Sequence, residues 1–434
     1  MCRASTIHKS SNTIDANQVS SINSIGELFR DYGEEYIEKH KPNREQIKLI
    51  RSIRICRTPA LGGHKYTCVH CKHEHFVYNN CGNSRCMICQ AVKREQWIDK
   101  LKASLLDVPY MHCVFTVPHQ LNSLCRQNQS AMYSLAMKVA WKTVKIIGVE
   151  QGYTPGMTSV LHTFGSDMKY HIHVHALVTY GGMSDKGDWI FPRAKSKLER
   201  HEKICKRYRT IFLKEIEIIH NKFKLNYHQD IDTLLNSIRN IRWVVNSTKP
   251  TMNTSIIENY LARYINRVAV SPNRLQYAKH LAEVNLIHND YKNQITGKPA
   301  PKLIKNLQPL QAIHQILQHT LPSYFQKSRR YGLHNQSTTI KKRIPISLKR
   351  NGQTVRTVFE ILTQILKLKS LRCENCGAEE MIKEKLYSDP YYTLQYLNKL
   401  NKPPPVLTQQ TTQAPHYSIT LHGSALPLIK QIQV

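Results

Sequence analysis

The clearest alternation of polar and apolar positions lies in residues 169–178, where three histidines at positions 171, 173 and 175 alternate with apolar residues. In a β-strand, side chains at positions i, i+2 and i+4 point to one face of the sheet. The pattern therefore predicts a strand that presents His171, His173 and His175 on one face, while the apolar residues between them face a core. Such a row of imidazoles favours a metal site over a merely solvated edge strand.

A second predicted strand, residues 159–164, precedes this one across a turn at residues 165–167. A hairpin between them places His162 on the same face as the later histidines, where it becomes a third candidate metal ligand. A register shift of one residue would remove it from that face. The predicted opposite pairs are His162 with His173, Val160 with His175, and Phe164 with His171.

Apolar residues at helical spacing predict an amphipathic helix over residues 256–268. Tyr260 and Tyr264 lie one turn apart on it, Tyr264 within the apolar stripe and Tyr260 at its edge beside Arg263 and Arg267. Taken alone, this helix favours tyrosines that only pack. Beside a histidine metal site, both phenols become candidate nucleophiles, and the two arginines become candidate phosphate ligands in DNA binding.

Two Cys-x-x-Cys pairs, Cys68 with Cys71 and Cys86 with Cys89, lie in a polar segment rich in turn residues. This spacing predicts one four-thiolate structural zinc site on which the folding of a small module depends. A fifth cysteine, Cys81, could complete a second site or replace one ligand, and the sequence leaves both possibilities open.

A further pair, Cys373 and Cys376, lies far along the chain and supplies only half of a zinc site. It could pair with another chain, hold a weakly bound ion or be inert, and the inert reading is favoured.

Charge narrows the choice of partner. The chain of 434 residues has 62 Lys and Arg against 30 Asp and Glu, a formal net charge of +32. This excess indicates a polyanionic binding partner. Nucleic acid is the first candidate, and an anionic membrane surface is the second. We find neither a run of about 20 apolar residues nor a secretory signal, so we expect a protein that does not insert into a membrane. In the cytosol its cysteine thiols are expected to stay reduced.

The order of these segments resembles the bacterial rolling-circle transposases of the two-tyrosine, insertion-sequence ninety-one-like type, within the HUH (histidine–hydrophobic–histidine) endonuclease superfamily. The resemblance covers about residues 25 to 335. The matching segments are residues 60–64, 86–90, 114–122, 161–165, 171–175, 260–269, 319–322 and 330–332.

This resemblance implies that His173 and His175 are paired ligands of a catalytic Mg²⁺ or Mn²⁺, and that Tyr260 and Tyr264 are the nucleophiles. It implies an enzyme that nicks and rejoins single DNA strands through a covalent phosphotyrosine, with single-stranded element ends and target DNA as partners. A cytoplasmic bacterial protein associated with the nucleoid is expected. The resemblance does not say which tyrosine attacks first.

The expected fold class is α+β, with an HUH-type catalytic domain built on a central antiparallel sheet with helices, preceded by a small zinc-binding module. The expected domains are residues 1–60, a disordered start and helical segment; 61–100, the zinc module; 101–275, the catalytic domain; and 276–434, a basic region with a flexible tail.

Two other functions remain as alternatives. A plasmid rolling-circle replication initiator or relaxase would use the same chemistry, but the zinc module and the later family segments argue against it. A zinc-dependent DNA-binding regulator without catalysis would bind DNA but neither nick it nor form a covalent adduct.

Overall fold

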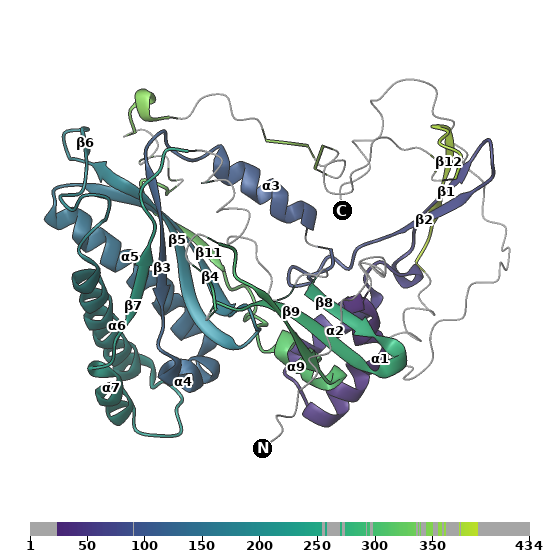
Figure 1. Ribbon diagram of the computed structural model, residues 1–434, viewed down its shortest axis with the longest axis horizontal. Coiled ribbons are helices and arrows are strands. Elements are labelled where there is room, and N and C mark those ends of the chain that lie inside the picture. The colour runs from purple at the N-terminus through teal and green to yellow at the C-terminus, as the bar shows by residue number, and fades with distance from the viewer. Residues whose placement is uncertain are drawn as a thin grey trace, which may run out of the picture.

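In the residues that it describes, the computed structural model has helices and three antiparallel sheets, which confirms the predicted α+β class (Figure 1). Within the described part of the chain, none of the helices combines the length and the hydrophobicity that a membrane span requires. The structure describes residues 24–89, 91–253, 257, 270, 274–291, 293–295, 298–335, 337, 339, 344–349, 355–357, 360–361, 373 and 375–388.

The largest sheet has the strand order β11-β4-β5-β3-β7, with the short β6 paired to β5. Every neighbouring pair is antiparallel. The strands are β3 (Tyr110–Thr116), β4 (Thr154–Phe164), β5 (Tyr170–Met183), β6 (Trp189–Ile190), β7 (Val244–Ser247) and β11 (Ser328–Gly332).

One face of this sheet forms the main core, because successive residues of a strand point to opposite faces. Cys113 and Phe115 of β3 and Ile172 and Val174 of β5 are buried there. Helices α5 (Gln129–Glu150) and α6 (His201–Phe223) lie against the sheet in Figure 1 and contribute apolar side chains to the same core. The shorter helices α4 (Asn122–Gln127) and α7 (Ile231–Arg239) lie on the same side of the molecule.

The opposite face is partly covered by α3 (Ala91–Lys102) and the segment that follows it. Leu101 and Leu105 pack there in a smaller core with Tyr110, Val160 and Leu177 of the sheet. The part of the sheet around Tyr110 and Leu177 is therefore covered on both faces. The histidines of β4 and β5 lie beyond it, toward the turn that joins these two strands.

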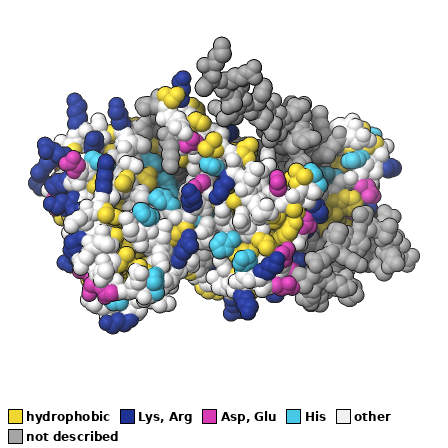
Figure 2. All heavy atoms as spheres, turned by 60° about the horizontal axis from the view of Figure 1, so that its bottom comes forward, with side chains coloured by type: hydrophobic (Ala, Val, Ile, Leu, Met, Phe, Trp, Pro, Cys, Tyr) yellow, Lys and Arg dark blue, Asp and Glu magenta, His cyan; other side chains and the backbone are white. Residues whose placement is uncertain are grey.

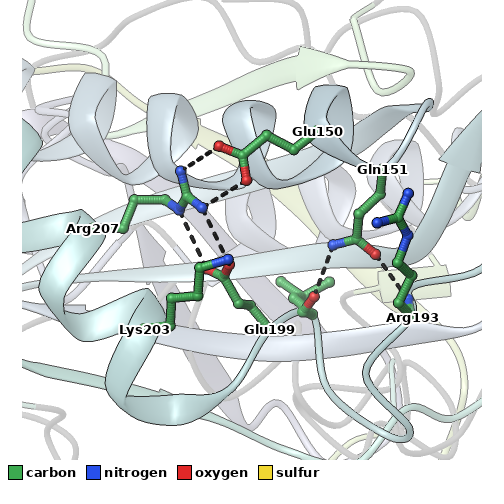
Figure 3. Close-up of polar contacts among 7 residues, drawn as sticks. Glu150, Gln151, Arg193, Glu199, Lys203 and Arg207 are labelled. Atoms are coloured by element: carbon green, nitrogen blue, oxygen red, sulfur yellow. Dashed lines mark hydrogen bonds and ion pairs between the residues drawn. The ribbon is translucent and has the colours of Figure 1, made fainter.

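A charged network fixes the end of α5 to the start of α6 (Figure 3). Arg207 donates to both carboxylate oxygens of Glu150, at 2.8 and 2.7 Å, and to both oxygens of Glu199, at 3.2 Å each. Burial alone would raise the pKa of Glu199, but hydrogen bonds from Arg207 and Lys203 hold it below its ordinary value. Bidentate contacts of this kind fix geometry as well as charge.

A second core joins the N-terminal helices to elements from much later in the chain. Helices α1 (Ser24–His40) and α2 (Arg44–Ile55) pack with α9 (Pro309–Leu317) and with a sheet of order β10-β9-β8. The strands of that sheet are β8 (Leu275–Ala278), β9 (Glu283–Asn289) and β10 (Lys302–Leu307). These contacts cross the boundaries expected at residues 100 and 276.

The third sheet also combines distant segments, in the order β12-β1-β2. Strands β1 (Gly63–Cys68) and β2 (Glu74–Tyr78) form a hairpin, and β12 (Met381–Leu386) pairs with the other edge of β1. Figure 1 shows this sheet extending away from the rest of the molecule. Its formation therefore requires a strand beyond residue 380 to reach a hairpin that lies before residue 80.

The turn between β4 and β5 contacts the second core. Met168 is fully buried there, and its carbonyl accepts a hydrogen bond of 2.9 Å from the side chain of Gln318. The Ser166 hydroxyl donates to the carbonyl of Asn289 at 3.0 Å. The hairpin that carries the histidines is therefore held at its tip by a different part of the molecule.

We predict that Gly332→Ala lowers the free energy of unfolding by about 2–4 kcal/mol, measured by chemical denaturation. Gly332 has φ +55°, and a Cβ there would overlap the carbonyl oxygen of Pro155 and lie 2.6 Å from the Trp141 ring. Gly187→Ala is the matched control, since φ is +94° but no atom lies within 4 Å. It should cost only the backbone strain, about 1 kcal/mol. Equal losses would show that the steric contact is unimportant.

Candidate functional site

Strands β4 and β5 bring three histidines to one face of the large sheet. His162 pairs with His173 and Val160 with His175, so the predicted hairpin register is confirmed at these positions. The register shifts between His162 and Phe164, so Phe164 pairs with Tyr170 and the predicted pairing with His171 is wrong. Two residues of β5, His171 and Ile172, thus stand opposite the single residue Thr163 of β4, and the pairing beyond this point is offset by one.

The three histidines form a compact cluster. One ring nitrogen from each of His162, His173 and His175 lies within 4.8 Å of the others. The ring centroids of His162 and His175 are 4.4 Å apart, and those of His173 and His175 are 4.8 Å apart. The side chains of His162 and His175 are buried, while His173 is partly exposed. A substrate could therefore approach the cluster from the side of His173.

A fourth histidine, His112 of β3, contacts this cluster and was not singled out from the sequence. Its Nε2 and the Nδ1 of His175 share a hydrogen bond of 2.9 Å. Burial lowers the pKa of His112 to about 3, so its ring is neutral at ordinary pH. A signal was available, because His112 alternates with the buried Met111 and Cys113 and so must face the histidine side of the sheet.

The hydrogen bonds of the cluster leave the correct nitrogens for a metal. The carbonyl of His171 can only accept, so the Nδ1–H of His173 donates to it at 3.0 Å, which leaves Nε2 as the ligand atom. In the same way, His175 can donate from Nδ1 to His112 and bind through Nε2. Outer partners that fix the imidazole tautomer are typical of metal sites. The residues present therefore fit a divalent cation held by three nitrogens.

The predicted nucleophile helix lies almost entirely outside the described residues, and this includes Tyr260, Tyr264, Arg263 and Arg267. Its one described position, Ile257, is buried against the histidine side of the sheet, in the smaller core with Val160 and Leu177. The amide of Ile257 donates to the carbonyl of Asn253 at 3.1 Å, the spacing of a helical turn.

The cysteines form two separate groups. The first consists of Cys56, at the end of α2, with Cys81, Cys86 and Cys89, whose sulfurs all lie within 4.8 Å of one another. Hydrogen bonds among the neighbouring thiols raise the pKa of Cys86, and burial raises it further. A bound divalent cation would displace these protons. Cys56 was not considered from the sequence, and Cys81 is a member of the group.

The second group consists of Cys68, Cys71, Cys373 and Cys376. The predicted grouping of Cys68 and Cys71 with Cys86 and Cys89 in one site is therefore wrong, and so is the view that Cys373 and Cys376 stand apart as half a site. The pairing of β12 with β1 explains both errors. Spacing along the chain shows which cysteines share a turn, but not which turns meet.

The surface carries the charge expected of a DNA-binding protein. Lys and Arg side chains are spread over most of the coloured surface in Figure 2, and Asp and Glu side chains are sparser there. This agrees with the excess of 62 basic over 30 acidic residues in the whole sequence. Such a surface attracts phosphate regardless of base sequence.

Two protein families match the chain. The family described as "Transposase zinc-binding domain" matches residues 28–117, which contain six of the clustered cysteines. The family described as "Putative transposase" matches residues 156–342, which contain the three clustered histidines and both candidate tyrosines. No solved structure matches the chain.

Two relatives are similar over most of their length. The "Putative transposase y4qJ" of Sinorhizobium fredii is 31% identical over 322 residues, covering 71% of this chain and 79% of the relative. The "Transposase for insertion sequence element IS801" of Pseudomonas savastanoi pv. phaseolicola is 24% identical over 350 residues, covering 77% of this chain and 82% of the relative.

We predict that His112→Phe weakens Mn²⁺ binding about 10- to 100-fold, measured by calorimetric titration. Phe keeps the ring but cannot accept the hydrogen bond that orients His175. His171→Ala is the control, because it keeps the backbone carbonyl that His173 uses and lies outside the cluster. If both variants bind Mn²⁺ like the wild type, His112 does not support the metal site.

Proposed function

The chain belongs to the IS91-like transposases with an N-terminal zinc-binding domain, and from that premise we propose that it nicks and rejoins single DNA strands by tyrosine transesterification in rolling-circle transposition. DNA as the partner and zinc as a structural ion follow from the family. The strand specificity, the covalent intermediate and the catalytic metal are the proposal.

The observation that carries the proposal is the convergence of His162, His173 and His175, with His112 behind them. A purely structural role does not require three imidazoles with one nitrogen of each within 4.8 Å of the others. Mn²⁺ or Mg²⁺ bound there would polarise a phosphate oxygen and stabilise the charge that develops on it. Nitrogen ligands favour Mn²⁺ of the two.

Tyr260 and Tyr264 are the proposed nucleophiles. The phenol loses its proton, and its oxygen attacks the phosphorus of a phosphodiester. The bond from phosphorus to the 3′ oxygen breaks, and that oxygen takes up a proton to become a free 3′-hydroxyl. The 5′-phosphate remains attached to the tyrosine. Arg263 and Arg267 would neutralise the phosphate.

The position of Ile257 supports this assignment. Ile257 lies three residues before Tyr260 and belongs to the same buried cluster as Val160, the residue that pairs with His175. Ile257 therefore lies on the same side of the sheet as the metal ligands. A tyrosine that follows Ile257 in the chain could attack a phosphate held at these ligands.

Single strands fit this site better than duplex DNA. His162 and His175 are only 1% and 6% exposed, so the scissile phosphate must reach into the sheet surface. A flexible single strand can bend to present one phosphate there, whereas a duplex is stiff over many base pairs. Two tyrosines allow two successive strand transfers without release of the first covalent end.

The alternatives are separated by different observations. The transposase relatives and the zinc-binding family favour a transposase over a replication initiator or relaxase. A regulator without catalysis has no need of the histidine cluster, but it would bind DNA equally well. Formation of a covalent adduct distinguishes it from the proposed enzyme.

We predict that Tyr260→Phe and Tyr264→Phe each block complete transposition, while at least one of them still forms a covalent adduct with single-stranded element ends and Mn²⁺. Phe keeps ring packing but lacks the attacking oxygen, so the double variant should form no adduct and still bind DNA. Peptide mapping of the adduct identifies the attacking residue. We expect Tyr260, at the edge of the apolar stripe, to be the better-exposed phenol.

Tyr291→Phe is the matched control, since Tyr291 is 57% exposed and lies outside the site. His173→Ala should bind DNA but fail to nick it, because phosphate contacts elsewhere supply the affinity. An adduct that maps to a tyrosine outside residues 256–268, or one that persists in the double variant, would refute the two-tyrosine mechanism.

A further inference from the structure

Two turns at one end of the β12-β1-β2 sheet have the same backbone geometry. The amide of Lys72 donates to the carbonyl of Cys68 at 3.1 Å, and the amide of Gly377 donates to the carbonyl of Cys373 at 2.8 Å. Lys72 and Gly377 both have positive φ, 58° and 75°. Each turn therefore follows a Cys-x-x-Cys pair and closes on the first cysteine in the same way.

The strands bring these two turns face to face. Cys68 pairs with Met381 in the ladder, and the amide of Val69 donates to the carbonyl of Glu380 at 3.1 Å. The sulfurs of Cys68 and Cys376 are 3.6 Å apart, and those of Cys71 and Cys373 are 3.5 Å apart. Four sulfurs about 2.3 Å from a tetrahedral zinc ion are about 3.8 Å from one another.

We propose that Cys68, Cys71, Cys373 and Cys376 bind a zinc ion of their own, separate from the ion held by the Cys56 group. Two of these ligands lie outside residues 28–117, which the zinc-binding family matches. Four thiolates fill a tetrahedral site without leaving an open position, so the ion is structural. On binding it displaces the thiol protons and forms four sulfur–metal bonds.

This ion links parts of the chain that are 302 positions apart, from Cys71 to Cys373. The large sheet and both sets of covering helices lie between them. A cross-link between such distant residues reduces the conformational entropy of the unfolded chain more than a cross-link between near neighbours does. The ion therefore fastens the end of the described chain to the N-terminal hairpin.

The zinc content of the full-length protein tests this site. Elemental analysis should find one zinc ion fewer per chain in the double variant Cys373→Ser/Cys376→Ser than in the wild type. Cys205→Ser is the control, because Cys205 belongs to neither group and should leave the content unchanged. Equal zinc in the double variant and the wild type would overturn the proposal.

A second measurement guards against misfolding of the double variant. Cys376 is exposed, so Cys376→Ser alone should keep the fold. After replacement of zinc by Co²⁺, the wild type should show the sulfur-to-cobalt absorption of two four-thiolate sites. Cys376→Ser should lose part of that absorption, whereas an unchanged spectrum would show that this sulfur is not a ligand.

The charge of the same sheet carries an independent inference. On one face, Lys65 lies between two carboxylates, Glu74 at 3.0 Å and Glu384 at 3.1 Å. The ladder places no carboxylate of these described strands on the other face, which we call the lysine face. Besides Cys68 and Met381 at its end, the lysine face consists of His64, Tyr66, His75, Val77, Lys383 and Lys385.

Contacts within the lysine face concentrate its charge around an aromatic ring. The Nζ of Lys383 lies 6.0 Å from the centre of the Tyr66 ring. Burial lowers the pKa of His64, and the positive charges of Lys383 and Lys385 lower it further. Both lysines therefore lie close enough to the His64 ring to affect its charge. Lysines beside an aromatic ring match the backbone and the stacked bases of a single DNA strand.

We infer that the lysine face binds single-stranded DNA, with Lys383 and Lys385 on phosphates and Tyr66 against a base. This role concerns binding only and does not depend on the tyrosine chemistry proposed above. It gives the sheet that extends away from the molecule a contact with DNA outside the histidine cluster.

Salt titrations with an oligo-dT strand test this surface. Lys383→Gln and Lys385→Gln should each reduce the slope of log affinity against log salt by about 0.7, the loss of one phosphate contact. Lys65→Gln removes the same charge from the other face and should leave the slope unchanged. Tyr66→Leu should weaken binding roughly tenfold. Equal slopes for all three lysine variants, or unchanged binding by Tyr66→Leu, would overturn the assignment.

Discussion

The register of the β4–β5 hairpin is the constraint on which the histidine site depends. A shift of one residue would turn His162 toward α5 and the main core, where Leu161 now packs. The apolar residues that alternate with the histidines prevent this shift, because Leu161 and Val174 would lose their burial. The tip is also fixed, since Met168 and Ser166 bond to a separate part of the molecule. The packing that builds the core thus holds the imidazoles in place.

Local periodicity was sufficient to predict the two strands of the histidine hairpin and the opposition of His162 and His173, because these depend on neighbours in sequence or across one turn. It also contained the signal for His112, which alternates with core residues in β3. The bulge beyond His162 could not be predicted, because nothing in the residues at 163–169 specifies where the ladder slips. The tyrosine segment stays a prediction, since all but Ile257 lies outside the described residues.

The cysteine groups could not be predicted from spacing, because their members meet only after distant elements pack together. Cys56 reaches its group through the packing of α2, and Cys373 reaches Cys71 through β12. The number of cysteines held a partial signal, since eight of them form two groups of four. The sequence left open whether Cys81 completes a second site or replaces one ligand, and only the packing of α2 brings Cys56 to it. Composition therefore limits how many sites are formed, while topology decides their members.

The central place of β1 in its sheet has a consequence for synthesis of the protein. The ribosome synthesises the chain from the N-terminus, so the β1–β2 hairpin emerges long before β12. Strand β12, which ends at residue 386, is the second strand that pairs with β1. Until then one edge of β1 carries unpaired amide and carbonyl groups, which can pair with other chains. A product that stops before β12 keeps that edge permanently. A chain that includes β12 covers this edge, so this late strand protects the sheet from pairing with other chains.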